Sequence, residues 1–319
     1  MRLDQPFLKL PIRFSADALE AEVRALPRSA WVPHATGFPG NEAVRLVTPG
    51  GAATDDFDGP MSATEHLSHC PYVQQVMAEL DGVWGRSRFM GLGVGAEVPE
   101  HVDCHYHWRT HLRIHVPVIT NPKVEFSCGG ETVHMAAGEC WVFDSFRWHE
   151  VHNRGTEQRV HLVLDTVVSP RLWDLIEAAR GGGGAPAALI EPATRPAGPL
   201  RFERINMPLI MSPWEMRGHI AFMLGEVEPG PARDAVARQL ERLADGWAAL
   251  WAEFGDSPDA APAYRQALAE GRAALVAAGA DALALRNELK LLFVFVQLIG
   301  VTAVAKELDP AMGERRLAS

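Results

Sequence analysis

Between residues 86 and 168, short segments alternate apolar and polar residues and are separated by turn residues. In THLRIHVPVIT (110–120), a branched apolar residue occupies every second position from Leu112 to Val118. In KVEFSCGGETVHM (123–135), the Gly129-Gly130 pair predicts the turn of a hairpin. Alternation with a period of two is typical of a strand that buries one face. Several such strands in succession indicate a β-sandwich or a β-barrel.

Helical patterns lie on both sides of this region. SADALEAEVRAL (15–26) and PYVQQVMAELDGV (71–83) have apolar residues at helical spacing, and SPWE (212–215) is a capping box. The apolar stripe between Val236 and Phe254 predicts a long helix. We therefore expect three parts, which are a β domain with N-terminal helices (1–178), a Gly/Ala/Pro-rich linker (179–200) and a helical C-terminal domain (201–319).

Composition excludes several classes of protein. The 319 residues carry a net charge of −10, which argues against a nucleic-acid-binding protein. No secretory signal is visible at the N-terminus, and the four cysteines form no CxxC pair, so we expect a cytoplasmic protein. The apolar run 289–305 contains Lys290 and Gln297 and is short for a membrane span. It predicts a buried helix or a helix at the interface of a homodimer.

Nine of the thirteen histidines fall within residues 101–161, and two of the segments there could hold a metal ion. His101 and Asp103, two residues apart in a strand, point to the same face. FDSFRWHEVHN (143–153) offers His149 and His152 as a third ligand. Two histidines and one carboxylate form the facial triad of non-haem Fe(II) oxygenases, which leaves three coordination positions open.

Arg159 follows His149 by ten residues, a distance that suits one strand, a turn and the start of the next strand. Its planar guanidinium can bind a carboxylate through two hydrogen bonds. This spacing favours His149 over His152 as the third ligand. The set His101, Asp103, His149 and Arg159, embedded in strands, is more specific than the HxD tripeptide alone.

The set resembles the Fe(II)/2-oxoglutarate oxygenases of the aspartyl/asparaginyl β-hydroxylase group, which includes bacterial hydroxylases of free proline. The resemblance is clearest over residues 85–168. It implies a double-stranded β-helix, a cupin-like jelly roll, in which His101, Asp103 and His149 bind Fe(II) and Arg159 binds the distal carboxylate of 2-oxoglutarate. The RxH motif of the family matches Arg113 and His115 as further contacts to this cosubstrate.

The resemblance implies a dioxygenase that uses O2 to hydroxylate an unactivated carbon of a free amino acid or a small amino-acid-like molecule. Animal peptidyl hydroxylases of this group have Gly where this chain has Asp103, so a peptidyl aspartyl or asparaginyl substrate is the alternative. A cupin-type metalloenzyme that does not use 2-oxoglutarate is a further alternative. We expect residues 105–109 to form a loop over the mouth of the site, and His161 to pack behind Arg159.

Overall fold

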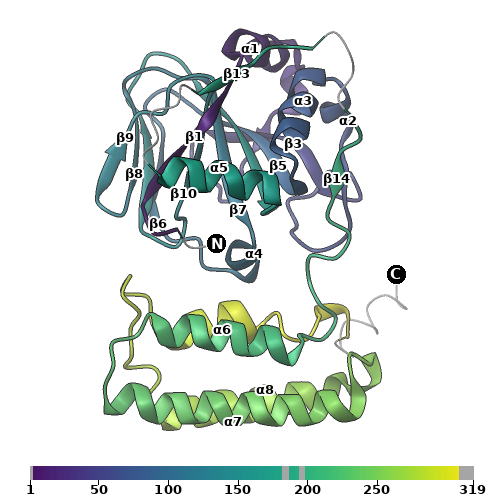
Figure 1. Ribbon diagram of the computed structural model, residues 1–319, viewed down its shortest axis with the longest axis vertical. Coiled ribbons are helices and arrows are strands. Elements are labelled where there is room, and N and C mark those ends of the chain that lie inside the picture. Colours follow the sequence, from purple (N-terminus) through teal and green to yellow (C-terminus); the bar gives the residue numbers. More distant parts are fainter. Residues whose placement is uncertain (1–2, 182–186, 194–197, 309–319) are drawn as a thin grey trace. The chain divides into compact units, whose positions relative to one another are not determined.

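The computed structural model describes residues 3–181, 187–193 and 198–308. The chain forms two compact units (Figure 1). The β unit comprises residues 1–103 and 110–206, and the helical unit comprises residues 104–109 and 207–319. The predicted domain limits at residues 178 and 200 stay predictions. The short segment 104–109, which the sequence analysis assigned to the β domain, groups with the C-terminal helices instead.

A large, mostly antiparallel sheet forms one half of the β unit. Its neighbouring strands are, in order, β13 (Ala188–Ile190), β1 (Phe7–Phe14), β10 (Glu139–Phe143), β7 (Leu112–Ile119), β12 (Arg159–Val167), β5 (Val83–Leu92), β3 (Asn41–Pro49) and β2 (Val32–Pro33). β4 (Met61–Ala63) pairs with β3, and β14 (Arg201–Phe202) pairs in parallel with β5. The strands β1, β2, β3 and β4 lie in a region for which the sequence analysis named only helices, and the strands were missed there.

A small antiparallel sheet faces the large one. It contains β6 (Glu97–His101), β11 (His149–Asn153), β8 (Val124–Cys128) and β9 (Glu131–Val133). The predicted hairpin joins β8 to β9, and both turn glycines have the positive φ that a two-residue turn requires, +56° at Gly129 and +84° at Gly130. Phe7 of the large sheet meets Phe126 of the small sheet edge to face, at 5.5 Å between ring centroids. This pair of facing sheets is the predicted double-stranded β-helix, or jelly roll.

Helices cover the outer side of the large sheet. They are α1 (Ala16–Ala25), α2 (Glu65–Ser68), α3 (Pro71–Leu80) and α5 (Pro170–Arg180), with a 3-10 turn η1 (Arg28–Ala30). α1 and α3 confirm the two predicted N-terminal helices. Their buried residues, among them Leu19, Val23 and Val76, join the apolar core formed with the sheet. Burying this one face of each helix is what holds them against the strands.

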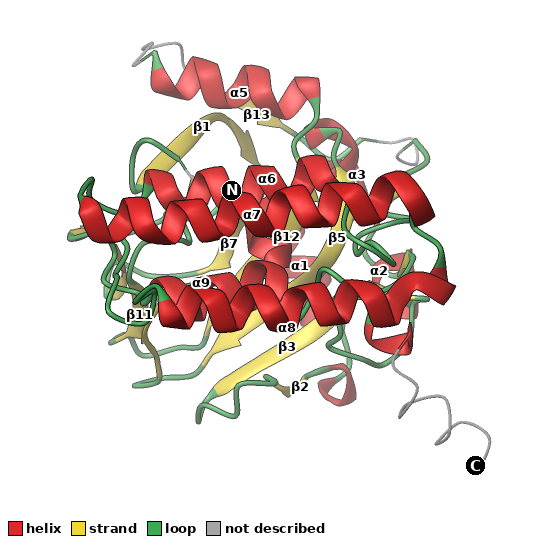
Figure 2. Ribbon diagram, turned by 90° about the horizontal axis from the view of Figure 1, so that it is seen from below, coloured by secondary structure: helices red, strands yellow, loops and turns green. Residues whose placement is uncertain are grey.

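The helical unit contains α4 (Tyr106–Thr110), α6 (Pro213–Gly225), α7 (Pro231–Phe254), η2 (Pro258–Ala260), α8 (Ala261–Ala277), α9 (Leu291–Phe295), η3 (Val296–Gly300) and η4 (Lys306–Leu308). The N-cap of the predicted capping box is confirmed, because the side chain of Ser212 accepts the Glu215 N–H at 3.3 Å. α6, α7 and α8 run side by side (Figures 1 and 2). The buried helix predicted within 289–305 is confirmed in part, since α9 continues directly as a π-helical turn and the helical segment ends at Gly300.

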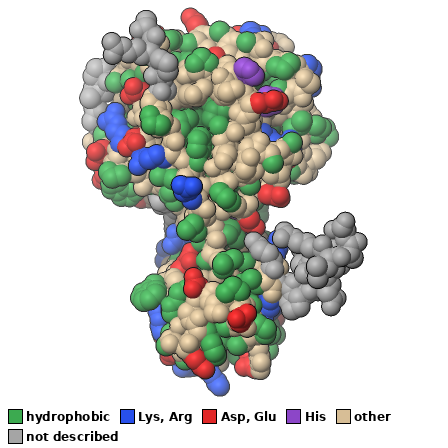
Figure 3. All heavy atoms as spheres, turned by 90° about the vertical axis from the view of Figure 1, so that its right-hand side faces the viewer, with side chains coloured by type: hydrophobic (Ala, Val, Ile, Leu, Met, Phe, Trp, Pro, Cys, Tyr) green, Lys and Arg blue, Asp and Glu red, His purple; other side chains and the backbone are tan. Residues whose placement is uncertain are grey.

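The surface carries both signs of charge. On the face drawn in Figure 3, acidic and basic side chains are interspersed with apolar ones. Within the described residues, no helix combines the length and the apolar character needed to cross a bilayer.

Candidate active site

The structure brings His101, Asp103 and His149 together where β6 ends and β11 begins. His101 ends β6 and His149 begins β11, and the two residues are paired directly across the strands. Asp103 follows β6, where its backbone N–H donates to the carbonyl of Ser145 at 2.9 Å. The Nε2 atoms of His101 and His149 lie 3.9 Å and 4.0 Å from the carboxylate oxygens of Asp103. One ligand atom from each residue lies within 4.8 Å of the others.

Both imidazoles are oriented for metal binding by backbone carbonyls. Nδ1 of His101 lies 2.7 Å from the carbonyl oxygen of Pro99, and Nδ1 of His149 lies 2.9 Å from that of Arg147. A carbonyl oxygen only accepts, so each Nδ1 carries the proton and each Nε2 presents its lone pair. Burial lowers the pKa of His149 to about 4, so this imidazole is neutral at physiological pH. The donor set therefore fits a divalent transition metal.

His152 is not part of this group. It lies three residues after His149 in the same strand, so its side chain points to the opposite face. Its two ring nitrogens each lie 3.2 Å from a carboxylate, Nδ1 from Glu97 and Nε2 from Glu150. Of the two candidates for the third ligand, the geometry favours His149.

Arg159 lies in a buried polar group that could bind an anion. It begins β12, and its Nη2 donates to Nδ1 of His161 at 2.7 Å. Nδ1 of His115, from the adjacent strand β7, lies 3.2 Å from the same His161 nitrogen. In the described part of the chain, Nε of Arg159 and the Nε2 atoms of His115 and His161 are buried without a hydrogen-bond partner. Such atoms are costly unless a ligand satisfies them.

The protonation of this group follows from its contacts. A guanidinium only donates, so Nδ1 of His161 is an acceptor and its proton is on Nε2. Burial and the neighbouring Arg159 hold the pKa of His161 well below its usual value, so the ring is neutral. Burial also lowers the pKa of Arg159 to about 9, which leaves it charged at neutral pH. The group thus combines a buried positive charge with a neutral imidazole donor.

Two phenylalanines connect this group to the metal ligands. The ring centroid of Phe143 lies 5.4 Å from that of His115 and 5.0 Å from that of His149. Phe126 likewise packs against both histidines, at 5.5 Å and 6.4 Å. The wall between the candidate metal centre and the Arg159 group is therefore apolar and aromatic, which excludes water from the space beside it.

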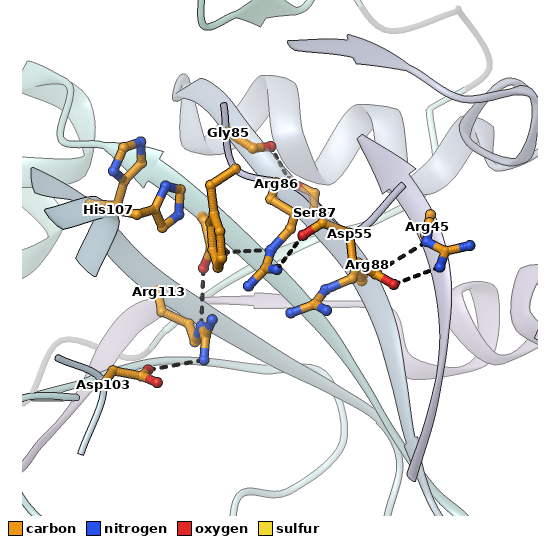
Figure 4. Close-up of polar contacts among 12 residues, drawn as sticks. Arg45, Asp55, Gly85, Arg86, Ser87, Arg88, Asp103, His107 and Arg113 are labelled. Atoms are coloured by element: carbon orange, nitrogen blue, oxygen red, sulfur yellow. Dashed lines mark hydrogen bonds and ion pairs between the residues drawn. The ribbon is translucent and has the colours of Figure 1, made fainter. Parts of the chain in front are cut away.

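Arg113 lies on another side of the metal ligands. Its Nη1 donates to Asp103 at 3.1 Å and its Nε donates to Asp165 at 3.0 Å (Figure 4). The guanidinium therefore holds the carboxylate of a candidate metal ligand in place. The predicted contact of Arg113 with the cosubstrate stays a prediction.

Residues 105–109 do not form the predicted loop. Most of them belong to α4, and His107 and Trp108 are buried. Within the helical unit, the hydroxyl of Tyr106 donates to Glu215 at 2.5 Å, and the guanidinium of Arg109 stacks on Phe222. The prediction failed because α4 is only five residues long, and the sequence has no capping signal that would indicate so short a helix.

The sequence analysis missed Arg86 and Arg88 on β5. Both are almost fully buried, with 6% and 2% of their surface exposed. Their spacing of two residues in a strand was the available signal, because it places two charges on one face. Arg45 on β3, held by Asp55 through two hydrogen bonds of 2.6 Å and 3.0 Å, lies beside them.

Residues 45–168 match the family model "Aspartyl/Asparaginyl beta-hydroxylase". A search of curated protein sequences found no match to this chain. Among solved structures, a 2OG-Fe(II) oxygenase family oxidoreductase from Burkholderia pseudomallei is 13% identical, with 48% of this chain and 77% of that chain covered at a TM-score of 0.38.

Two further structures are similarly distant. A Pseudomonas putida prolyl-4-hydroxylase is 15% identical, covering 52% of this chain and 94% of its own at a TM-score of 0.35. HygX from Streptomyces hygroscopicus, with nickel and 2-oxoglutarate bound, is 12% identical, covering 52% and 84% at a TM-score of 0.34. Likenesses this weak do not indicate a function. The matched segment 45–168 of the family model contains all three candidate metal ligands and Arg159.

Proposed function

We propose that this protein is an Fe(II)- and 2-oxoglutarate-dependent dioxygenase that hydroxylates a carbon of a small amino-acid-like substrate. The observation that carries the proposal is the pairing of two sites in one jelly roll. One is the group of His101, Asp103 and His149, and the other is the buried Arg159 with its unsatisfied neighbours. A 2-oxoglutarate oxygenase needs both, a metal with open positions and a cation for the far carboxylate of the cosubstrate.

His101, Asp103 and His149 would hold Fe(II) through two neutral imidazoles and one carboxylate. When bound, Fe(II) supplies the oxidation chemistry, in which 2-oxoglutarate and O2 become succinate and CO2 while one oxygen atom enters a substrate C–H bond. The chain keeps the imidazoles unprotonated at Nε2 through the carbonyls of Pro99 and Arg147. Arg113 holds Asp103 so that its carboxylate stays turned toward the two histidines.

Arg159 would bind the distal carboxylate of 2-oxoglutarate. Its Nε donor and the Nε2–H donor of His161 are both buried, and both lack a partner among the described residues. A carboxylate would satisfy the two donors and neutralise the buried charge. Phe126 and Phe143 keep the adjoining space apolar, so these hydrogen bonds would not compete with water.

The substrate class rests on Asp103. The complete triad is the feature by which this chain resembles the hydroxylases of free amino acids more than the animal peptidyl enzymes. A free amino acid or a similarly small molecule is therefore the substrate we propose, and O2 is the second substrate.

The first test is spectroscopic. Anaerobic protein loaded with Fe(II) should develop a visible charge-transfer band when 2-oxoglutarate is added, because the keto acid chelates the metal. With O2, the loaded protein should release succinate, slowly without substrate and faster with a substrate found by screening amino acids. His149→Ala and Asp103→Ala should lose both the band and the succinate. Metal binding without the band would favour a cupin-type enzyme that does not use 2-oxoglutarate, and unchanged turnover in both variants would refute the metal site.

A further inference from the structure

One turn of the chain, residues 144–147 between β10 and β11, contacts two of the three candidate metal ligands. The carbonyl oxygen of Ser145 accepts the backbone N–H of Asp103 at 2.9 Å. The carbonyl oxygen of Arg147 accepts the proton on Nδ1 of His149, also at 2.9 Å. The positions of Asp103 and His149 therefore depend on the conformation of this turn.

The carboxylate of Asp144 fixes the turn from within. Its Oδ1 accepts the backbone N–H of Phe146 at 3.2 Å, and its Oδ2 accepts Nε–H of Arg147 at 3.1 Å. The backbone carbonyl of Asp144 accepts the N–H of Arg147 at 3.0 Å and closes the turn. An aspartate side chain that bonds the N–H two residues ahead mimics a backbone turn. The side chain of Asp144 has 0% of its surface exposed, so loss of these bonds would leave donors unsatisfied away from water.

Asp144 is itself attached to both sheets. Its backbone N–H donates to the carbonyl of Pro6, directly before β1, at 3.0 Å. Its carbonyl accepts a bond of 3.5 Å from Sγ of Cys128, the last residue of β8. Because β1 belongs to the large sheet and β8 to the small one, Asp144 is a fixed point from which the turn reaches the candidate ligands.

Glu139, at the other end of β10, provides a comparison. Its carboxylate also fixes a turn, because it accepts the backbone N–H of Ala136 at 2.9 Å and pairs with Lys9 at 3.1 Å. The two carboxylates thus make the same kinds of contact at opposite ends of one strand. They differ in what the turn supports, since the turn at Asp144 leads to the candidate metal ligands. Stabilisation of the fold alone would give both residues the same effect.

We infer that Asp144 is a positioning residue of the metal centre. Its carboxylate holds the turn 144–147 so that the carbonyls of Ser145 and Arg147 keep Asp103 and His149 in ligating geometry. This inference rests on the proposed function, because it concerns the site that would bind Fe(II). Asp144 acts through the turn and not by contact with the metal. It raises the affinity for the metal because the ligands are ordered when the protein folds and not when the ion binds.

The test uses Co(II) as the probe, without 2-oxoglutarate and without turnover. Calorimetry gives the Kd, and the visible absorption of bound Co(II) reports the geometry of its ligands. Asp144→Ala should raise the Kd about 10- to 100-fold and shift the visible bands. Asp144→Asn keeps an acceptor for the N–H of Phe146 and should recover part of the loss. Glu139→Ala is the matched control, which should lower Tm but change neither the Kd nor the bands.

A measurement on the unsubstituted protein tests the same point without any variant. In the metal-free protein, the amides of Asp103 and Phe146 should exchange hydrogen at least about 100-fold more slowly than in an unstructured peptide, because the turn holds both. Unprotected amides would overturn the inference even if no variant folds. An unchanged Kd and spectrum in Asp144→Ala, or equal losses in Glu139→Ala, would also overturn it. No binding of Co(II) to the unsubstituted protein would instead refute the metal site of the proposed function.

Discussion

Replacing Arg159 by Met should make the protein more stable in the absence of 2-oxoglutarate and should remove most of the stabilisation that 2-oxoglutarate provides. Arg159 is 4% exposed, and in the described structure no carboxylate lies within 4.0 Å of it. Burial lowers its pKa from 12.5 to about 9, which corresponds to roughly 4–5 kcal/mol of unfavourable burial of the charge. Met has a similar length and no charge, so the variant avoids this cost. After allowance for the lost hydrogen bond to His161, we expect a gain of about 1–4 kcal/mol.

The cosubstrate should narrow this difference in stability. At a concentration of about 100 times its Kd, 2-oxoglutarate stabilises the folded protein by about 2.7 kcal/mol, or roughly 5–10 °C in Tm. In Arg159→Met the loss of a charged, two-pronged contact should raise the Kd by at least about 30-fold, so most of this shift disappears. Thermal unfolding of both proteins, loaded with Mn(II) and measured at pH 7.5 with and without 2-oxoglutarate, gives the four required Tm values.

Two results would refute this reasoning about Arg159. One is a variant less stable than the unsubstituted protein in the absence of 2-oxoglutarate, since Arg159 would then have a compensating partner. The other is an equal rise in Tm with 2-oxoglutarate in both proteins, since the cosubstrate would then bind elsewhere. Arg154→Met, at an exposed position, should change neither value.

Three more outcomes follow from the structure. Arg113→Met should weaken Mn(II) binding by about 10- to 100-fold, because Asp103 loses the group that orients it; an unchanged Kd in calorimetry would contradict this. Gly138→Ala should destabilise the β unit by about 1–3 kcal/mol in urea unfolding, because Gly138 has φ +77° and an added Cβ would collide with the carbonyl of Phe14. The control is Gly218→Ala on the exposed surface of α6, which should be neutral or stabilising. The predicted homodimer through the C-terminal helices should appear in size-exclusion chromatography as a mass that rises with protein concentration, and a monomer at every concentration would exclude it.

Several local features could be predicted because neighbours in the chain determine them. The spacing of two residues puts His101 and Asp103 on one face of any strand, whatever surrounds it. The Gly129-Gly130 turn and the cap at Ser212 likewise depend on a few adjacent residues, and the structure has both. The alternation in 110–120 was enough to identify β7, although not its neighbours in the sheet.

Other local patterns were not sufficient. The segment FLKLPIRF (7–14) alternates only in part and contains Pro11, yet it is β1 because β10 and β13 provide hydrogen-bond partners on both sides. The apolar run 289–305 satisfies a helical pattern, but the chain leaves the helix after Gly300 and pairs Val304 with Ile210. In both segments, pairing with distant residues outweighs local propensity.

The sequence by itself determined which residue types could form the site, two histidines, an aspartate and an arginine at spacings that strands can use. Only the tertiary structure decided which of them meet. The register of β6 against β11 places His149 opposite His101 and turns His152 away, and no local pattern contains that register. The electrostatic environment of Arg88 on β5 is likewise decided only by the tertiary structure, because Asp165 and Asp103, which act on its pKa, belong to segments that are distant in the chain.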